Sequence, residues 1–270
     1  MIKVGFIGLG EQGKPMAVNL AKDGFDLVVH DLRREPVDEL IAIGAKAANS
    51  PREVAGASEI IEVAVVDDAQ VEAVALGDDG IIAGAQPGSV IAIHSTIRPA
   101  TVCKIGAESA RRGIGIVDAP VSGGPRGAEL RTMCYMVGGD KEFVERCHPI
   151  FETSAKSIFH LGPLGAGMTA KLAHQVIICL NVLAASEGMA LAAKAGLDPT
   201  MMQEVVRVGG AQSRVADNWI KSQPTPNARK LWYKDLMLAL EVANELGLAL
   251  PATSMAQELI ESINPEEDRK

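Results

Sequence analysis

VGFIGLGEQGKPM, residues 4–16, places three glycines in the spacing G-x-G-x-x-G, after an apolar run that predicts a strand and before a helical pattern. The first glycine permits the tight turn, the second lets the backbone approach a pyrophosphate, and the third lets the helix pack on the strand. The helix N-terminus then faces the phosphates. A glycine-rich turn that binds nothing would not account for the preceding strand. The stretch predicts a dinucleotide site at Gly8, Leu9, Gly10, Glu11, Gln12 and Gly13.

Asp31 closes the second predicted strand, LVVHD, at about the distance from the glycines where dinucleotide-binding folds place an acid. An acid there accepts hydrogen bonds from the adenosine ribose and repels the 2′-phosphate of NADP. Arg33 and Arg34 follow, and either could pair with that phosphate. The sequence therefore favours NAD and leaves NADP open. The alternative for Asp31 is a turn residue that caps the next helix.

Apolar runs that predict strands alternate with helical patterns up to about residue 160. This alternation predicts βαβ units and a doubly wound, mainly parallel sheet. After Gly167 the pattern becomes one helix after another. We therefore predict an α/β Rossmann domain that binds a dinucleotide over residues 1–162, followed by an all-α domain over residues 163–270.

The composition argues against several classes of function. A formal net charge of −8 and a pI near 5.2 disfavour nucleic-acid binding, which usually needs a basic face. The N-terminal residues lack the pattern of a signal peptide, so we expect a cytoplasmic protein. The four cysteines lack CxxC spacing and predict free thiols, with no metal site.

One long apolar segment, residues 167–196, carries a lysine, Lys171, near its start. Asn181, Ser186 and Glu187 interrupt the apolar run, so we expect a buried helix and no membrane span. Two roles compete for Lys171. It extends from a core helix to the surface, or it is held in a cleft where a proton moves.

The stretch DAPVSGGPRGAE, residues 118–129, ends a predicted strand with Ser122, Gly123 and Gly124. Two adjacent backbone N–H groups beside a hydroxyl form a small concavity suited to a carboxylate. A plain turn is the alternative, and this stretch alone does not separate the two.

Four motifs occur in one order along the chain. Together they resemble the β-hydroxyacid dehydrogenase family, which includes enzymes like 3-hydroxyisobutyrate dehydrogenase and tartronate semialdehyde reductase, from residue 1 to about 260. The resemblance implies a Rossmann domain joined by a long helix to an all-α domain. It also implies hydride transfer between NAD(H) and the hydroxyl or aldehyde carbon of a short 3-hydroxy acid. The motifs are GFIGLGxxGxPMAxNL from Gly5, DAPVSGG from Asp118, GxxGxGxxxK from Gly162, and KDLxLAL from Lys234.

The resemblance also implies a role for each matching residue. Lys171 is the general acid and base, because the reacting hydroxyl must lose a proton in oxidation and the developing alkoxide must gain one in reduction. His174 and Gln175 follow it at the i+3 and i+4 positions of one helix face. We expect these two to bind substrate, together with Ser122, Gly123 and Gly124 at its carboxylate.

The remaining implied contacts are with the cofactor. Val65 and Val66 would line its groove, Thr96 would lie near the nicotinamide, and Lys234 would contact the cofactor or the substrate. For Lys234 the alternative is an exposed lysine paired with Asp235 or Glu241.

The sequence departs from the family pattern at two residues. Gln12 stands where the family usually has Met, and His174 stands where it typically has Asn. A histidine there could alter the protonation of Lys171, share the proton transfer, select another substrate, or act as a neutral donor in place of Asn. The segment before KDL is also short, so the preferred acid need not be the common one.

Two other classes of function remain open from the sequence. One is a non-catalytic NAD(P)-binding module, and the other is an enzyme similar to imine reductases, which typically lack the lysine. In the enzyme interpretation the partner is a small substrate with a carboxylate. The resemblance further implies a homodimer or homotetramer.

Overall fold

The computed structural model describes residues 2–221 and 225–263. The chain forms two compact units, Met1–Lys171 and Leu172–Lys270. The division falls inside one long helix, α9 (Ala166–Lys194), so this helix contributes residues to both units.

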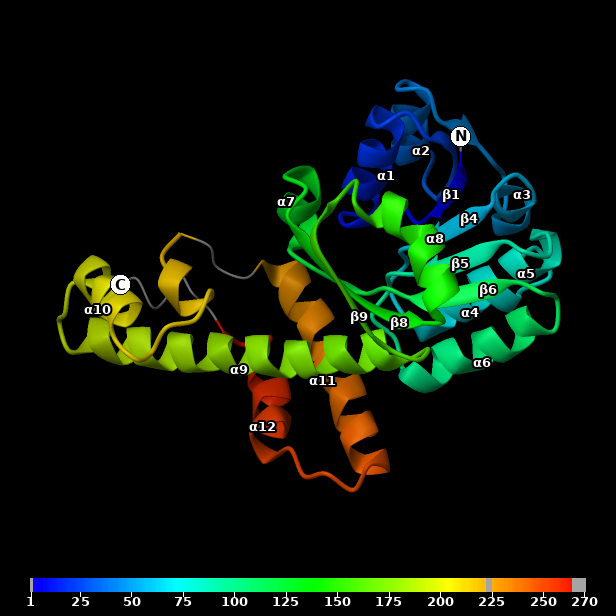
Figure 1. The fold of residues 1–270 in the computed structure, drawn as a ribbon. Helices are drawn as coiled ribbons and strands as arrows, with labels where there is room; N and C mark the ends of the chain where they lie inside the picture. Colours follow the sequence, from blue (N-terminus) through cyan, green and yellow to red (C-terminus); the bar gives the residue numbers. More distant parts are fainter. Residues whose placement is uncertain (1, 222–224, 264–270) are drawn as a thin grey trace. The chain divides into compact units, whose positions relative to one another are not determined.

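The first unit is built on a nine-stranded sheet among the described residues (Figure 1). Its strand order is β3-β2-β1-β4-β5-β6-β8-β7, with β9 paired to β8. The pairs from β3 to β6 are parallel, whereas β8 runs antiparallel to β6 and β7. The prediction of a doubly wound, mainly parallel sheet is confirmed. The strands are β1 (Lys3–Ile7), β2 (Asp26–His30), β3 (Lys46–Ala47), β4 (Ile60–Val63), β5 (Val90–Ile93), β6 (Gly115–Asp118), β7 (Val121–Ser122), β8 (Met133–Gly139) and β9 (Ala155–Gly162).

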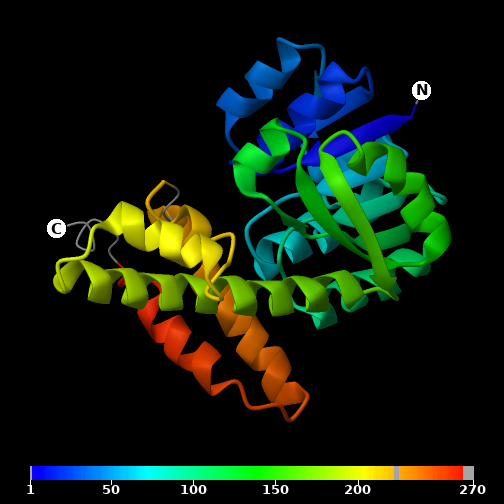
Figure 2. The same cartoon turned by 60° about the vertical axis from the view of Figure 1, so that its left-hand side comes forward.

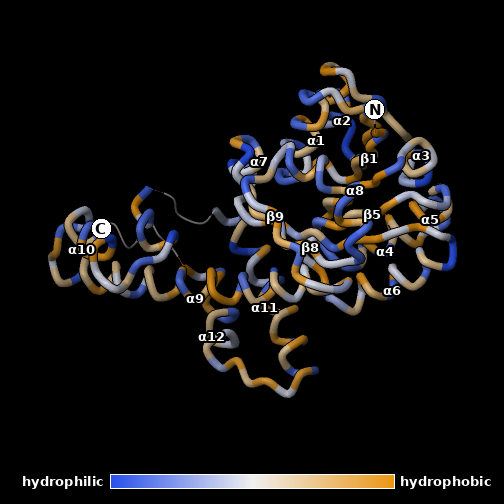
Figure 3. The backbone as a smooth tube through the Cα atoms, viewed as in Figure 1, coloured by the Kyte–Doolittle hydropathy of each residue, from blue (hydrophilic) through white to orange (hydrophobic). Residues whose placement is uncertain are grey.

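Helices cover both faces of this sheet, because alternate side chains of each strand point to opposite faces. In β5, Val90 and Ala92 join one core cluster, with α1, α2, α7 and α8, while Ile91 and Ile93 join the other, with α3 to α6. Figure 3 shows the hydrophobic residues concentrated on such central strands. The helices are α1 (Gly13–Lys22), α2 (Arg34–Ile41), α3 (Pro51–Gly56), α4 (Asp68–Leu76), α5 (Ile81–Gly84), α6 (Pro99–Ala110), α7 (Gly124–Glu129) and α8 (Lys141–Phe151).

The second unit is helical throughout its described residues (Figure 2). Its core includes Trp219, Leu236 and Ile260, packed with Cys179 and Val182 of α9. Asp198 caps the next helix by accepting a hydrogen bond from the Met201 N–H at 2.8 Å, and Pro199 follows as the first helical residue. Besides α9, the elements are α10 (Pro199–Val208), the 3₁₀ turn η1 (Ala216–Asn218), α11 (Pro226–Glu245) and α12 (Pro251–Leu259).

Helix α9 differs from its prediction in two respects. It is long and apolar enough, by length and composition, to cross a membrane, so the expectation that polar residues leave too short a run is wrong. The helix was also expected to be buried, but Ile177 and Leu191 are exposed, and 73% of Leu191 is accessible. Core helices of folded proteins pass the same test of length and composition, and α9 supplies Cys179, Val182 and Leu183 to a core cluster.

Candidate active site

The glycine loop between β1 and α1 has the geometry that its spacing predicts. Gly8 has a φ of +94°, and an added Cβ would lie 2.4 Å from the Ala64 carbonyl oxygen. At Gly13 an added Cβ would lie 2.0 Å from the Gly8 carbonyl oxygen, so a side chain would separate α1 from the loop. Gly10 has open space around its Cβ position. The loop therefore leaves its backbone accessible at the point where a pyrophosphate would approach.

Asp31 binds the glycine loop directly. Its Oδ2 accepts a hydrogen bond from the Leu9 N–H at 2.6 Å, and its Oδ1 accepts one from the Arg33 N–H at 2.8 Å. The Arg33 guanidinium donates to Asp31 Oδ1 at 3.1 Å and to the Leu9 carbonyl at 2.9 Å. Burial opposes ionisation of Asp31, but the hydrogen bonds from Arg33 and Leu9 outweigh it and lower the pKa of the carboxyl. Arg34 instead pairs with Asp38 at 2.8 Å.

The loops after β4 and β5 are tied together. The Ser95 hydroxyl accepts a hydrogen bond from the Val65 N–H at 2.9 Å, while the neighbouring Val66 is exposed. These contacts place the predicted cofactor residues Val65 and Val66 beside the loop that carries Thr96.

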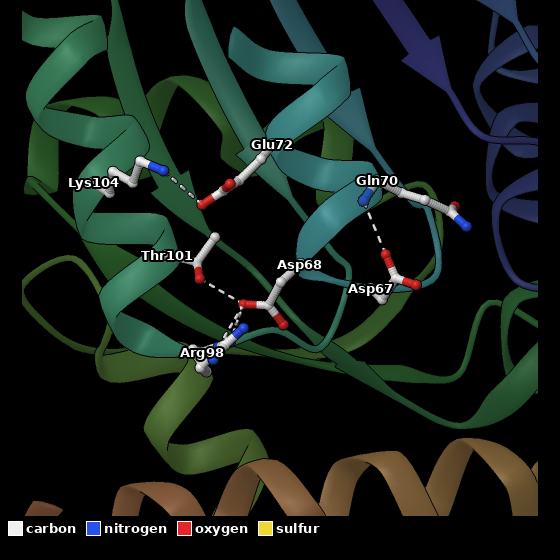
Figure 4. A network of polar contacts seen from close by, with 7 residues as sticks. All are labelled: Asp67, Asp68, Gln70, Glu72, Arg98, Thr101 and Lys104. Atoms are coloured by element: carbon white, nitrogen blue, oxygen red, sulfur yellow. Dashed lines mark hydrogen bonds and ion pairs between the residues drawn. The ribbon is translucent and has the colours of Figure 1, made fainter. Parts of the chain in front are cut away.

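A second tie between these loops involves Asp68 at the start of α4 (Figure 4). Its Oδ1 accepts hydrogen bonds from the Thr101 hydroxyl at 2.5 Å and from the Arg98 N–H at 3.1 Å. Burial opposes ionisation, but the hydrogen bonds from Thr101 and Arg98 prevail and lower the pKa of Asp68. Sequence reasoning missed Asp68, because nothing in the local pattern distinguishes it from Asp67, which caps α4 through the Gln70 N–H.

Lys171 lies beside the predicted carboxylate loop. Its side chain is buried, with 8% of the residue exposed, and Nζ donates a hydrogen bond to the Val121 carbonyl at 2.9 Å. Lys171 therefore does not extend to the surface. The next residues are Ser122, Gly123 and Gly124, and both glycines have positive φ, +134° and +64°. The lysine and the loop form one cluster within the first unit.

Met133 connects this cluster to the glycine loop. The Gln12 Nε2 atom contacts the Met133 sulfur at 3.6 Å, and Met133 also lines the space beside Gly123. The departure at Gln12 therefore lies between the two predicted binding loops. Cys134 pairs with Ser122 across the β7–β8 register. Burial raises the pKa of the Cys134 thiol, and the positive charge of Lys171 opposes this shift.

Asp118 is a residue of this cluster that sequence reasoning missed. It ends β6, is fully buried, and accepts hydrogen bonds from the Gly165 N–H at 2.8 Å and the Met168 N–H at 2.6 Å. Burial raises the pKa of the Asp118 carboxyl, although these N–H donors oppose the shift. The only signal in the sequence was its place at the start of DAPVSGG.

The second unit brings together His174, Gln175 and Lys234 through Asp235. The Gln175 Nε2 donates to Asp235 Oδ2 at 2.6 Å, and the Gln175 Oε1 lies 3.3 Å from His174 Nδ1. Because a carboxylate only accepts, the amide must turn its oxygen toward His174, which assigns the proton to Nδ1. Lys234 pairs with Asp235 at 2.9 Å, but its side chain is only 18% exposed. The alternative interpretation was an exposed lysine paired with Asp235 or Glu241. The ion pair with Asp235 matches it, but the low exposure of the Lys234 side chain does not.

No group of His, Cys, Asp or Glu side chains that could hold a metal ion occurs among the residues that the structure describes. Cys103, Cys134 and Cys147 are free thiols.

Comparisons with known proteins give one consistent result. Residues 3–162 match the family described as the NAD-binding domain of 6-phosphogluconate dehydrogenase. Residues 165–270 match the family described as the NAD-binding region of NADP-dependent 3-hydroxyisobutyrate dehydrogenase. The two matches together span nearly the whole chain.

Two characterised relatives are similar over almost their full lengths. The chain is 41% identical to 2-hydroxy-3-oxopropionate reductase of Escherichia coli (strain K12), covering 96% of this chain and 90% of the relative. It is 37% identical to NAD-dependent L-serine dehydrogenase of Pseudomonas aeruginosa, covering 96% and 91%.

Among solved structures, 3-hydroxyisobutyrate dehydrogenase from Salmonella typhimurium superposes with a TM-score of 0.86 at 32% identity, covering 97% of this chain and 94% of that one. An imine reductase from Myxococcus stipitatus also superposes, with a TM-score of 0.70 at 16% identity and coverage of 97% and 93%. At that identity the second likeness shows a shared fold alone.

Proposed function

Because the chain belongs to the β-hydroxyacid dehydrogenase family, we propose that it transfers a hydride between a nicotinamide cofactor and the hydroxyl or aldehyde carbon of a short 3-hydroxy acid. One observation supports this proposal above the others. Lys171 is buried beside the loop of Ser122, Gly123 and Gly124, with Nζ 2.9 Å from the Val121 carbonyl. A proton donor next to a carboxylate-binding loop is what a hydroxy acid dehydrogenase requires.

The residues of the first unit fit a dinucleotide. Gly10 leaves room for close approach of a pyrophosphate, and Asp31 lies against the same loop through the Leu9 N–H. When bound, the cofactor supplies the hydride acceptor or donor. We assign its contacts to the glycine loop of residues 8–13, to Asp31, and to the loops that carry Val65, Val66 and Thr96.

Lys171 moves the proton in this mechanism. In oxidation Nζ takes the proton of the substrate hydroxyl, and in reduction it returns a proton to the oxygen of the former aldehyde. The ammonium form also stabilises negative charge that develops on that oxygen. The backbone N–H groups of Gly123 and Gly124 and the Ser122 hydroxyl hold the substrate carboxylate. His174 and Gln175 contribute further substrate contacts.

NAD is the favoured cofactor in this proposal, and NADP remains a possible second one. Asp31 disfavours a 2′-phosphate, but the Arg33 guanidinium already neutralises part of its charge at 3.1 Å. Lys234 would contribute a further cofactor contact while it remains paired with Asp235.

We also propose a homodimer or homotetramer formed through the second unit. Met201, Val205 and Val208 form an exposed apolar stripe on α10, and Val208 is 84% exposed. A surface of this kind is common at interfaces between identical chains. The free thiols of Cys103, Cys134 and Cys147 suit the reducing cytoplasm, where we place the protein.

Initial rates with NADH and NADPH test the proposed activity. The substrate panel contains tartronate, methylmalonate, malonate and succinate semialdehydes, together with matched aldehydes that lack the carboxylate. We expect turnover of the acids alone, with loss of turnover in Lys171→Ala. Cofactor binding without turnover of any acid would favour a non-catalytic module, and reduction of cyclic imines in its place would favour the imine reductase alternative.

A further inference from the structure

Asp118 joins two parts of the first unit that are distant in sequence. Its Oδ1 accepts a hydrogen bond from the Gly165 N–H at 2.8 Å, and its Oδ2 accepts one from the Met168 N–H at 2.6 Å. Gly165 directly precedes α9 and Met168 lies in its first turn, where the N–H groups have no carbonyl partner within the helix. The carboxylate therefore fixes the start of α9 to the end of β6.

The surrounding backbone leaves space for this carboxylate and little else. An added Cβ at Gly138 would lie 2.4 Å from Asp118 Oδ1, and one at Gly167 would lie 2.9 Å from Oδ2. Burial raises the pKa of Asp118, because the negative charge loses solvation. The N–H donors and the positive end of the α9 dipole offset part of that loss.

The same two segments meet again at the proposed catalytic lysine. Lys171 lies one helical turn after Met168, and Val121 lies three residues after Asp118. Nζ of Lys171 donates to the Val121 carbonyl, and Ser122 of the carboxylate loop comes next. The segment from Asp118 to Ser122 thus contacts α9 at two points and then enters the loop that would bind the substrate carboxylate.

We propose that Asp118 is a positioning residue that sets the distance between the carboxylate loop and Lys171 Nζ, and thereby the chain length of the acid that the enzyme accepts. This inference rests on the proposed function. A 3-hydroxy acid has one carbon between its carboxyl carbon and its reacting carbon. Each additional carbon moves the reacting oxygen by about one C–C bond, roughly 1.5 Å. Misplacement by about 1 Å reduces a rate on the order of a hundredfold, so this spacing can discriminate between chain lengths.

The test compares Asp118→Asn with a matched control, Asp198→Asn. Asp198 also accepts a backbone N–H at the start of a helix, that of Met201 at 2.8 Å, but it belongs to α10 in the second unit. An asparagine at position 118 keeps the size of the side chain but replaces one acceptor with a donor, which faces an N–H of α9.

Three quantities are measured for each protein: the NADH dissociation constant, kcat/KM for malonate and succinate semialdehydes, and hydrogen exchange of the peptide spanning residues 163–175. For Asp118→Asn we expect nearly unchanged NADH affinity, faster exchange at the start of α9, and a loss of about ten- to a hundredfold in kcat/KM for the three-carbon acid. The loss of kcat/KM should be smaller for the four-carbon acid, so the ratio of kcat/KM for malonate semialdehyde to that for succinate semialdehyde falls. Asp198→Asn should keep both the ratio and the exchange at the start of α9, because asparagine caps a helix about as well as aspartate.

Equal losses for both acids, or unchanged exchange at the start of α9, would overturn the inference. If Asp118→Asn does not fold, Gly165→Ala perturbs the same donor through its φ of +95°, with only ordinary contacts near the new Cβ. Gly165→Ala should lower the same ratio of kcat/KM values, but by a smaller factor. An unchanged ratio would also overturn the inference. A wild-type protein that turns over none of the four semialdehydes of the substrate panel contradicts the proposed function, whereas the exchange measurement still decides whether Asp118 anchors α9.

Discussion

Two aspartates at the carboxyl ends of parallel strands show how one residue type serves two purposes in one sheet. Asp31 follows β2 and Asp118 ends β6, and each accepts backbone N–H groups from a distant segment. Their pKa values nevertheless shift in opposite directions. Hydrogen bonds from Arg33 and Leu9 lower the pKa of Asp31 against the effect of burial, whereas burial raises the pKa of Asp118.

The difference follows from what surrounds each carboxylate. Asp31 lies at the edge of the glycine loop beside Arg33, whose exposed guanidinium can move when a ligand arrives. Asp118 is fully buried and contacts the backbone of α9. The carboxylate at the edge of the glycine loop can select a ligand, while the fully buried one holds the helix that carries Lys171.

Lys171→Ala should have the largest effect on activity. It tests whether the helix that Asp118 holds in place carries the catalytic lysine. Removal of the proton donor should reduce kcat at least about a hundredfold, with little change in NADH affinity. Stopped-flow or steady-state rates and a fluorescence titration measure the two quantities. Lys104→Ala is the control, because Lys104 is an exposed lysine of the same unit paired with Glu72. Near-normal turnover in Lys171→Ala would mean that Asp118 anchors a helix without a catalytic lysine.

Asp31→Ala tests the aspartate at the glycine loop. Without the carboxylate, Arg33 becomes available to a 2′-phosphate, so the preference for NADH over NADPH should fall by about tenfold. The ratio of kcat/KM values for the two cofactors measures this change. Arg34→Ala is the control, since Arg34 pairs with Asp38 and should leave the ratio unchanged. An unchanged ratio in Asp31→Ala would show that Asp31 does not discriminate between the cofactors.

Asp235 offers an intermediate case, because it is buried but contacts side chains. It orients Gln175, which in turn accepts from His174 Nδ1. Since Gln175 engages one ring nitrogen of His174 as a hydrogen-bond donor, as it could engage the amide of an asparagine, His174→Asn should change kcat by less than about fivefold and leave the pH–rate profile in place. A displaced profile would show that His174 is coupled to the proton transfer.

The smallest expected effect is on the pH dependence of stability, where the two aspartates should have opposite signs. The folded protein binds more protons at Asp118 than the unfolded chain at pH values just above 3.8, so this residue's contribution to stability falls as the pH rises. Asp31, with its lowered pKa, loses its contribution as the pH falls below 3.8. Urea unfolding of wild type, Asp118→Asn and Asp31→Asn between pH 3 and 6 measures how the free energy of unfolding changes with pH. One such group changes it by at most about 1.4 kcal/mol per pH unit. Slopes of the same sign would contradict the comparison.

The two aspartates also show what a single sequence can predict. The place of Asp31 beside the glycine loop was predictable, because the glycine spacing and the strand end are local features with a known mechanism. The role of Asp118 depends on N–H groups 47 and 50 residues later in the chain. No periodicity or spacing indicates such a contact, although its motif marked the neighbouring Ser122, Gly123 and Gly124.

Helix α9 shows a further limit of local pattern. Its apolar composition predicted a helix that is buried on most faces, yet Ile177 and Leu191 are exposed. Hydrophobicity determines that such a helix forms, whereas the packing partners determine which faces they cover. The prediction that Lys171 lies at the substrate came from the resemblance of ordered motifs, since without it the sequence favoured a lysine that extends to the surface.

Deuterium transfer from cofactor to substrate tests the central claim most directly. The protein is incubated with 4-deuterated NADH of each stereochemistry and tartronate semialdehyde, and the product is analysed by mass spectrometry. We expect one of the two cofactors to place a single deuterium on carbon 3 of the hydroxy acid, and Lys171→Ala to slow this transfer strongly. Binding of NADH without any transfer of deuterium to a panel of 3-oxo acids would contradict the account.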